Sequence, residues 1–170
     1  DSVFNAAVTS SIASDLSLNF ALAEKFAVPS AQANYNFDSL LIPTRIVAAE
    51  IFTQHEEVIK EGSLGNAIRA TLSVPFFYKP IRFNGQYLFD GGIYNNFPVD
   101  ILNDEFSPDV IIGSNVSSKI YNEYPKDQDD KLLNSSLLFM ILDKSDPDDI
   151  PETGVYLEPD LNTYTAFDFN

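Results

Sequence analysis

One carboxylate in the 170-residue chain stands out because of its neighbours. Asp90 follows the apolar-rich run Gln86–Phe89 and is followed by Gly91 and Gly92. A carboxylate at the end of a strand projects from the edge of a sheet, and glycines let the backbone beside it turn sharply. In open α/β sheets the ligand crevice lies at the carboxyl ends of the strands. Asp90 is therefore a candidate catalytic residue, although an ordinary turn has the same pattern.

Few other residues could act as nucleophiles or metal ligands. There is no cysteine, which excludes disulfides, thiolate metal sites and a cysteine nucleophile. The single histidine, His55, excludes a multi-histidine metal site, and its polar surroundings indicate an exposed turn rather than a Ser–His–Asp triad. Ser73, close before Pro75, is interpreted as a structural cap or packing residue. The acidic run 146–149 lacks the central glycine and distal glutamate of a calcium loop and indicates a solvated loop.

The elements that must position Asp90 can be predicted from apolar patterns. From Ser14, two adjacent apolar stripes predict a helix with a wide, well-buried face that ends at Pro29. Residues 45–52 form an apolar run typical of a strand covered on both faces, and residues 57–59 predict a brief second strand. Ser63 is a good N-cap for the helix that follows.

A hairpin is predicted directly before the candidate site. Asn84 and Gly85 lie between two apolar runs, and both residues of such a turn need positive φ, which this pair tolerates. Beyond it we expect a helix from Pro98, a buried strand and a leucine-rich helix, at residues 98–106, 110–116 and 132–142. The alternation of strands and helices predicts an α/β layered domain with at least partly parallel strands.

Composition narrows the classes of partner. Hydrophobic residues make up 45% of the chain, which fits a globular domain. With 10 Lys and Arg against 25 Asp and Glu, the formal net charge is −15, which disfavours nucleic-acid binding and electrostatic docking on an anionic membrane. No stretch approaches the roughly 20 apolar residues of a membrane span. The chain starts at Asp1 and its only methionine is Met140, so we expect it to be either a processed piece or part of a longer polypeptide.

The block from Gly62 to Leu102 has a specific joint spacing. It reads GSLGNAIRATLSVPFFYKPIRFNGQYLFDGGIYNNFPVDIL. It resembles the patatin-like phospholipase family, in which a Gly-Ser/Thr start opens a helix ending in Arg-Ala-Ser-x-Ser-x-Pro, and a hairpin leads to Asp-Gly-Gly/Ala and Asn-x-Pro-Val. The matching residues are Arg69, Ala70, Thr71, Ser73, Pro75, Asp90, Gly91, Gly92, Asn96, Pro98 and Val99. The resemblance is strongest over residues 38–117.

The resemblance implies a three-layer α/β/α patatin-like domain, of which residues 1–170 would be the later portion. It also implies a serine hydrolase of lipid acyl esters, such as phospholipids, that uses a Ser–Asp dyad without histidine, metal or cofactor. Asp90 would be the dyad aspartate, which orients and activates the serine hydroxyl. The residues that would support the site are Gly91, Gly92, Asn95, Asn96 and Pro98.

The chain departs from the family at the nucleophile. The family serine lies in a Gly-x-Ser-x-Gly elbow, and neither the spacing at Gly62–Gly65 nor that at Gly113–Asn115 provides it. The glycine-rich oxyanion loop is absent too. We therefore expect the nucleophile outside this chain, in the remainder of the same polypeptide, and no ester hydrolysis by these 170 residues alone. The alternative is a non-catalytic patatin-fold module for binding or scaffolding that has lost the nucleophile.

Two further segments bear on substrate and location. Phe76 and Phe77 either line a pocket for an acyl chain or belong to the hairpin core. Residues 161–169 resemble the tail of bacterial patatin-like proteins that are associated with the outer membrane. This resemblance predicts a bacterial cell-envelope location, either outer-membrane-associated or periplasmic and surface-exposed, with membrane contact through segments outside this chain.

Overall fold

The computed structural model describes residues 15–75, 77–116, 136–137, 140, 142 and 150–159. The chain divides into two compact units, Asp1–Tyr94 and Asn95–Asn170. Predictions for Phe76, the acidic run and the tail segment lie outside the described residues. So does most of the predicted helix 132–142, of which residues 136, 137, 140 and 142 are helical. In the described part of the chain, no helix combines the length and the apolarity that crossing a membrane requires.

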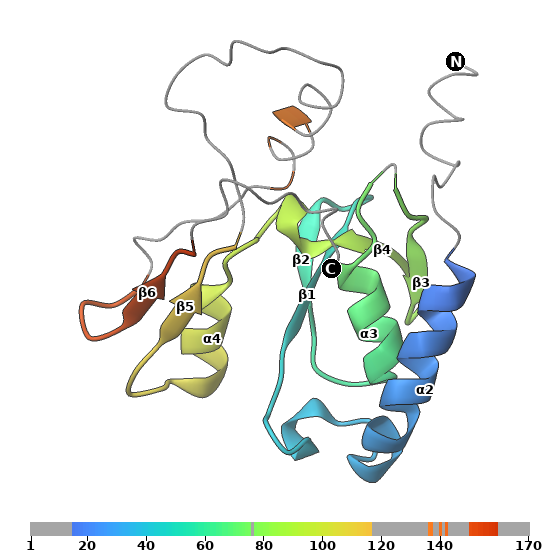
Figure 1. The fold of residues 1–170 in the computed structure, drawn as a ribbon, viewed down its shortest axis with the longest axis horizontal. Coiled ribbons are helices and arrows are strands. Elements are labelled where there is room, and N and C mark those ends of the chain that lie inside the picture. The colour runs from blue at the N-terminus through green and yellow to red at the C-terminus, as the bar shows by residue number, and fades with distance from the viewer. Residues whose placement is uncertain are drawn as a thin grey trace. The chain divides into compact units, whose positions relative to one another are not determined.

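The first unit contains a four-stranded sheet with the strand order β2-β1-β4-β3 (Figure 1). Its strands are β1 (Ile46–Glu50), β2 (His55–Ile59), β3 (Ile81–Phe83) and β4 (Gln86–Asp90). Every neighbouring pair in this sheet is antiparallel. The predicted parallel pairing is found in the second unit and not in this sheet, because β1–β2 and β3–β4 are hairpins and β4 returns antiparallel to β1. The predicted α/β class is confirmed.

The core of the first unit lies between this sheet and α3 (Leu64–Thr71). All five residues of β1 are buried, as predicted for a strand covered on both faces. Ala48 of β1 and two alanines of α3 have no exposed surface, and side chains this small let helix and strand approach closely. Ser63 caps α3 as predicted, with its Oγ accepting a backbone N–H of the first turn. Phe37 of the short helix η1 (Phe37–Ser39) belongs to the same core.

The helix before the sheet, α2 (Leu16–Gln32), continues past Pro29, so the predicted helix end is wrong. A proline inside a helix removes its own backbone donor but not the bonds that follow it. Accordingly, the N–H of Ala33 still donates to the Pro29 carbonyl over 3.0 Å. The Oγ of Ser30 adds a bond of 2.6 Å to the carbonyl of Phe26 in the same turn.

α2 is also less buried than predicted. Of its two apolar stripes, one is buried or half-buried and consists of Leu18, Leu22 and Phe26. The other stripe is exposed and consists of Leu16, Phe20, Ala23 and Ala27. Leu16 and Phe20 have 63% and 68% of their surface exposed. The two stripes predicted a wide buried face, but α3 packs against only part of it.

The β3–β4 hairpin forms as predicted. Asn84 has a φ of 48° and Gly85 a φ of 90°, which are the positive values that a two-residue hairpin turn needs. Phe83 pairs with Gln86 on either side of this turn. The hairpin therefore delivers Asp90 at the far end of β4.

The second unit contains α4 (Val99–Phe106), β5 (Ile112–Ser114) and β6 (Val155–Leu157), and β5 pairs parallel with β6. Pro98 directly precedes α4, as predicted. The expectation of a fully buried strand at 110–116 is wrong. Gly113 is buried, but Ile112 is 66% exposed. The described core beside these strands is small and consists of Phe97, Val99 and Ile111, with Ile150 and Tyr156 packed against it.

Candidate active site at the end of strand β4

The register of the sheet shows on which face Asp90 lies. Asp90 pairs with Ala48 of β1, and two residues further along β1 Glu50 pairs with Leu88. Paired residues, and residues two apart on one strand, share a face of a sheet. Ala48 and Leu88 belong to the core formed with α3. Asp90 therefore lies on the α3 side of the sheet, where β4 ends.

The turn after Asp90 requires glycine at its first position. A Cβ on Gly91 would lie 2.4 Å from the carbonyl oxygen of Val47, which no real side chain tolerates. Gly91 begins the short helix η2 (Gly91–Ile93), and Asp90 caps it by accepting the N–H of Gly92 on Oδ1 at 2.9 Å. The Asp-Gly-Gly pattern thus forms a tight turn whose own carboxylate holds it in place.

The carboxylate of Asp90 is half-buried and only partly satisfied. Within the part of the chain that the structure describes, its Oδ2 makes no hydrogen bond. Burial raises the pKa of Asp90 above its usual value, and the hydrogen bond from the Gly92 N–H only partly opposes this. A carboxylate with a raised pKa and an unused oxygen is a better proton acceptor than an exposed one.

A model of the patatin-like phospholipase family matches residues 9–103, and the turn just described lies inside that range. The chain belongs to the patatin-like phospholipase family. The first unit contains three predicted parts of the family motif. These are the helix α3, the β3–β4 hairpin and the Asp-Gly-Gly turn.

Several known proteins are similar to this patatin-like chain over shorter stretches. NTE family proteins of Mycobacterium bovis and Mycobacterium tuberculosis, both uncharacterised, are 32% identical over 65 residues, which is 38% of this chain and 11% of each relative. A protein of Invertebrate iridescent virus 6 named probable lipid hydrolase is 35% identical over 52 residues, 31% of this chain and 17% of that protein. The aligned stretches thus span less than a fifth of each relative.

The other predicted site residues divide between the two units. Gly91 and Gly92 are brought together with Asp90 in the first unit. Asn95, Asn96 and Pro98 belong to the second unit, where the Asn95 side chain donates to Asp100 over 3.0 Å. Their role in supporting the site stays a prediction.

Two phenylalanines are predicted either for an acyl pocket or for the hairpin core, and the structure describes one of them. Phe77 is half-buried in the segment between α3 and β3, and its N–H donates to the Val74 carbonyl over 3.2 Å. Phe76 lies outside the described residues. Both alternatives for this pair remain predictions.

None of the serines considered from the sequence has the features of a patatin nucleophile. Ser63 is the N-cap of α3, and Ser114 lies within β5 of the second unit. Ser73 has no exposed surface, and its hydroxyl is bonded to Arg69 at both ends, as donor and as acceptor. The prediction that Ser73 is structural is therefore confirmed.

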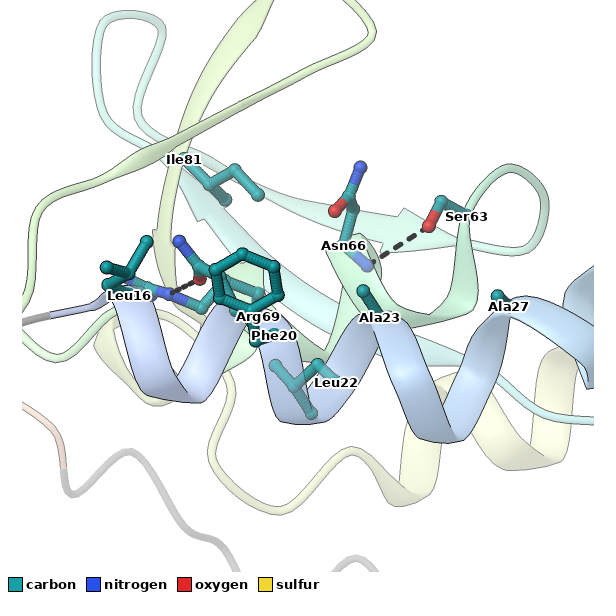
Figure 2. A pocket seen from close by; sticks show the side chains of 11 residues that line it. Leu16, Phe20, Leu22, Ala23, Ala27, Ser63, Asn66, Arg69 and Ile81 are labelled. Carbon is teal, nitrogen blue, oxygen red and sulfur yellow. Dashed lines mark hydrogen bonds between the residues drawn. The ribbon is translucent and has the colours of Figure 1, made fainter.

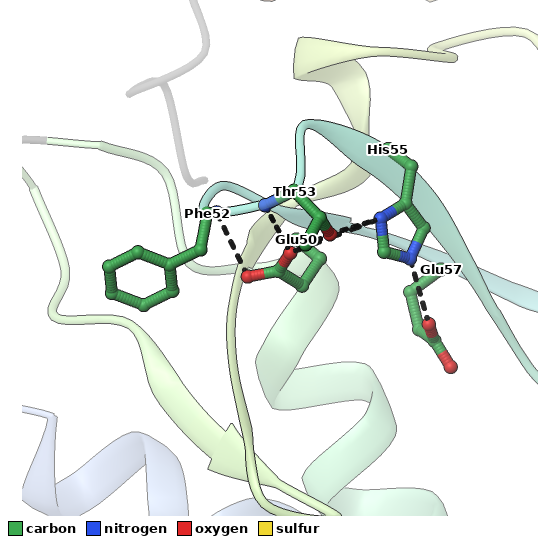
Figure 3. A network of polar contacts seen from close by, with 5 residues as sticks. All are labelled: Glu50, Phe52, Thr53, His55 and Glu57. Carbon is green, nitrogen blue, oxygen red and sulfur yellow. Dashed lines mark hydrogen bonds and ion pairs between the residues drawn. The ribbon is translucent and has the colours of Figure 1, made fainter.

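Sequence reasoning missed a polar network around Glu50 at the β1–β2 turn (Figure 3). The buried carboxylate of Glu50 accepts the N–H groups of Phe52 and Thr53 at 2.9 and 2.7 Å, and the hydroxyl of Thr53. The hydrogen bond from the Thr53 hydroxyl, followed by those from the two N–H groups, lowers the pKa of Glu50. The pattern gave little signal, because the side chains that commonly bond a nearby turn are those of Asp, Asn, Ser and Thr rather than Glu.

His55 joins this network from the first position of β2. Its Nδ1 lies 2.7 Å from the Thr53 Oγ1, and its Nε2 lies 3.5 Å from an oxygen of Glu57. Its side chain is about half exposed, so the predicted exposure is confirmed, but it starts a strand rather than lying in a break. In the described residues, no group of three or more acidic or histidine side chains is arranged to hold a metal ion.

A groove of about 440 Å³ runs between α2 and α3 (Figure 2). The exposed apolar stripe of α2 forms one wall together with Asn19 and Leu22, and the remainder is lined by Ser63, Gly65, Asn66, Arg69 and Ile81. Neither Asp90 nor Phe77 is among its lining residues. The groove is therefore separate from the Asp-Gly-Gly turn, although one of its lining residues, Arg69, belongs to α3, which precedes that turn in the chain.

Proposed function

We propose that the polypeptide containing this chain hydrolyses lipid acyl esters with a Ser–Asp dyad, in which Asp90 is the aspartate and the serine lies outside these 170 residues. The observation that carries this proposal is the state of Asp90. Its carboxylate is half-buried, has a raised pKa, and is held by one oxygen through Gly92. Family membership and the relative named as a lipid hydrolase support the same class of reaction.

The geometry of Asp90 suits the task of a base without histidine. Because Oδ1 is held by the Gly92 N–H, Oδ2 can accept the proton of a serine hydroxyl. The serine oxygen then attacks the ester carbonyl carbon, the proton passes to the leaving alcohol, and an acyl-enzyme remains. Water then attacks the acyl carbonyl carbon while Asp90 accepts its proton. The proton passes to the serine oxygen, which restores the serine and releases the fatty acid. A weak base leaves much of the rate to positioning and to oxyanion donors.

The substrate that we propose is a lipid or phospholipid acyl ester. The net charge of −15 makes a neutral or zwitterionic lipid surface easier to approach than an anionic one. A cell-envelope location and membrane contact through other segments of the polypeptide fit this substrate class, and both remain proposals.

The direct test replaces Asp90 in the full polypeptide. Asp90→Asn keeps an oxygen for the Gly92 N–H but removes the base, so kcat on a fluorogenic acyl ester and on phosphatidylcholine vesicles should fall by about 10²–10⁴-fold. Asp104→Asn, an exposed position on α4, is the matched control and should leave kcat unchanged. Near-normal hydrolysis by Asp90→Asn would assign the base to another residue.

One observation favours the alternative of a non-catalytic module. No two of the seven glycines of the chain are four residues apart, so Gly-x-Ser-x-Gly is impossible within it. The enzyme and the non-catalytic module predict different properties for the polypeptide as a whole. An upstream Gly-x-Ser-x-Gly together with ester turnover supports the enzyme, whereas lipid binding without turnover supports the module.

A further inference from the structure

The backbone of Asp90 is held by a residue that is not part of the sheet. β3 accompanies β4 only as far as the pair Ile81–Leu88, so Asp90 extends beyond the end of its hairpin partner. At that point the N–H of Asp90 donates to the backbone carbonyl of Ser73 over 3.1 Å. This carbonyl takes the place that the next residue of an edge strand would fill. The position of Asp90 therefore depends on the position of Ser73.

Ser73 is in turn fixed by Arg69, one helical turn earlier. The hydroxyl of Ser73 donates to the Arg69 carbonyl over 2.9 Å and accepts from Nη1 of the same residue over 2.7 Å. Ser73 has no exposed surface, so these two bonds satisfy its hydroxyl without water. With both roles of the hydroxyl occupied, the Ser73 carbonyl has little freedom to turn away from Asp90.

The guanidinium of Arg69 is anchored from two other segments. It is 4% exposed and donates to Asp15 at 2.8 Å and Asn19 at 3.1 Å, both at the start of α2. It also donates to the Lys79 carbonyl at 3.3 Å and lies 5.0 Å from the centre of the Tyr78 ring, just before β3. The planar guanidinium of arginine has five N–H donors and can make all these hydrogen bonds at once, which a lysine ammonium cannot.

We propose that Arg69 is a positioning residue for Asp90 and acts through Ser73, so that the start of α2, the end of α3 and the carboxyl end of β4 form one rigid support. This inference rests on the proposed role of Asp90 as the dyad aspartate. A dyad without histidine has no imidazole to adjust its geometry, so a small displacement of the carboxylate should affect the rate strongly. Displacements of about 1 Å from residues remote from the chemistry can cost about 10²-fold.

Two variants interrupt the support at different points. Ser73→Ala removes the hydroxyl and keeps the backbone carbonyl, whereas Arg69→Lys keeps the charge beside Asp15 and loses the planar guanidinium. The matched control is Ser30→Ala. Ser30 is also a buried serine, and its hydroxyl donates to the residue four positions earlier, Phe26, and accepts the N–H of Leu64. It shares the chemistry of Ser73 but not the link to Asp90.

The first measurement does not depend on activity. Hydrogen exchange of the Asp90 amide, read by mass spectrometry of peptides spanning β4 in the full polypeptide, should accelerate about tenfold or more in Ser73→Ala and Arg69→Lys. In Ser30→Ala it should match the parent. Unchanged exchange at Asp90 in both variants would overturn the proposal, whether or not the polypeptide hydrolyses esters.

The second measurement concerns catalysis. In Ser73→Ala and Arg69→Lys, kcat should fall about 10–100-fold with KM nearly constant, and the acid limb of the pH–rate profile should shift, because the surroundings of the base change. A loss no larger than that of Ser30→Ala would overturn the positioning role. If the parent polypeptide hydrolyses no ester, the proposed function fails, and the exchange measurement still decides the link between Arg69 and Asp90.

Discussion

Two carboxylates on one face of the same sheet have opposite surroundings. Glu50 ends β1 and Asp90 ends β4, and the pairing of Ala48 with Asp90 places both side chains on the α3 side. Glu50 accepts two backbone N–H groups and the hydroxyl of Thr53, and these bonds lower its pKa. Asp90 accepts one N–H, and burial raises its pKa.

The difference is the one expected between a structural carboxylate and the carboxylate that we propose as the base. Bonds to the charged form of Glu50 stabilise the turn, so its contribution to stability is present above its unfolded-state pKa and is lost as pH falls through its lowered folded-state pKa. Asp90 behaves in the opposite sense. Because its folded-state pKa is raised, its contribution is full below the unfolded-state pKa and is lost as pH rises through the folded-state pKa. The charged form of Asp90 therefore does not stabilise the fold.

The largest expected effect is on catalysis, and it compares amide substitutions at both positions in the full polypeptide. Asp90→Asn should lower kcat by about 10²–10⁴-fold, whereas Glu50→Gln should leave it within about threefold, because Glu50 bonds its own turn. Steady-state kinetics on one acyl ester measures both. Equal losses in the two variants would remove the distinction.

The next effect concerns the backbone on which Asp90 depends. Gly91→Ala would place a Cβ 2.4 Å from the Val47 carbonyl, and we expect a loss of about 1–3 kcal/mol in the free energy of unfolding. Gly85→Ala is the control, because a Cβ there meets nothing within 4 Å and only the positive φ of 90° opposes it, at about 1 kcal/mol. Urea denaturation ranks the two, and a larger loss at Gly85 would contradict the close approach.

A third effect tests the structural carboxylate. Glu50→Ala leaves the N–H groups of Phe52 and Thr53 without their acceptor, so the melting temperature should fall by several degrees. Glu24→Ala, at an exposed position of α2, is the comparison and should change it little. Calorimetry at neutral pH provides the measurement. An unchanged melting temperature in Glu50→Ala would show that the network does not stabilise the hairpin.

The smallest effect is a gain in stability. Asp90→Asn removes a desolvated charge, so the variant should melt slightly above the parent at neutral pH. This difference in melting temperature should close as pH falls and Asp90 is protonated. Glu50→Gln should show the reverse trend, because the parent melts above this variant at neutral pH and loses that difference in acid. Melting curves at a series of pH values separate the two. Parallel trends in both variants would contradict the opposite pKa shifts.

The sequence predicted those features whose causes are local. The turn at Asn84 and Gly85 and the cap at Ser63 depend on a few neighbouring residues, and the continuous apolar run of β1 indicates a buried strand; all three are confirmed. The Glu50 network is just as local, since its partners lie two and three residues away, but glutamate is not one of the side chains that commonly bond a nearby turn.

The features that the sequence did not predict depend on distant partners. Arg69 and Asp15 are 54 positions apart, so no periodicity reports their contact. The open stripe of α2 depends on how much of its face α3 covers, and the antiparallel return of β4 depends on strand pairing across more than thirty residues. The site follows the same division. The residues of the Asp-Gly-Gly turn could be predicted, whereas the support beneath it could not.

The hydrogen bond between the Asp90 N–H and the Ser73 carbonyl has a consequence for solubility. A backbone donor left open beyond the end of β3 would invite an extended segment of another molecule to add to the sheet. Ser73 already occupies that donor. This one donor at the end of β4 is thereby removed from edge-to-edge pairing with another molecule.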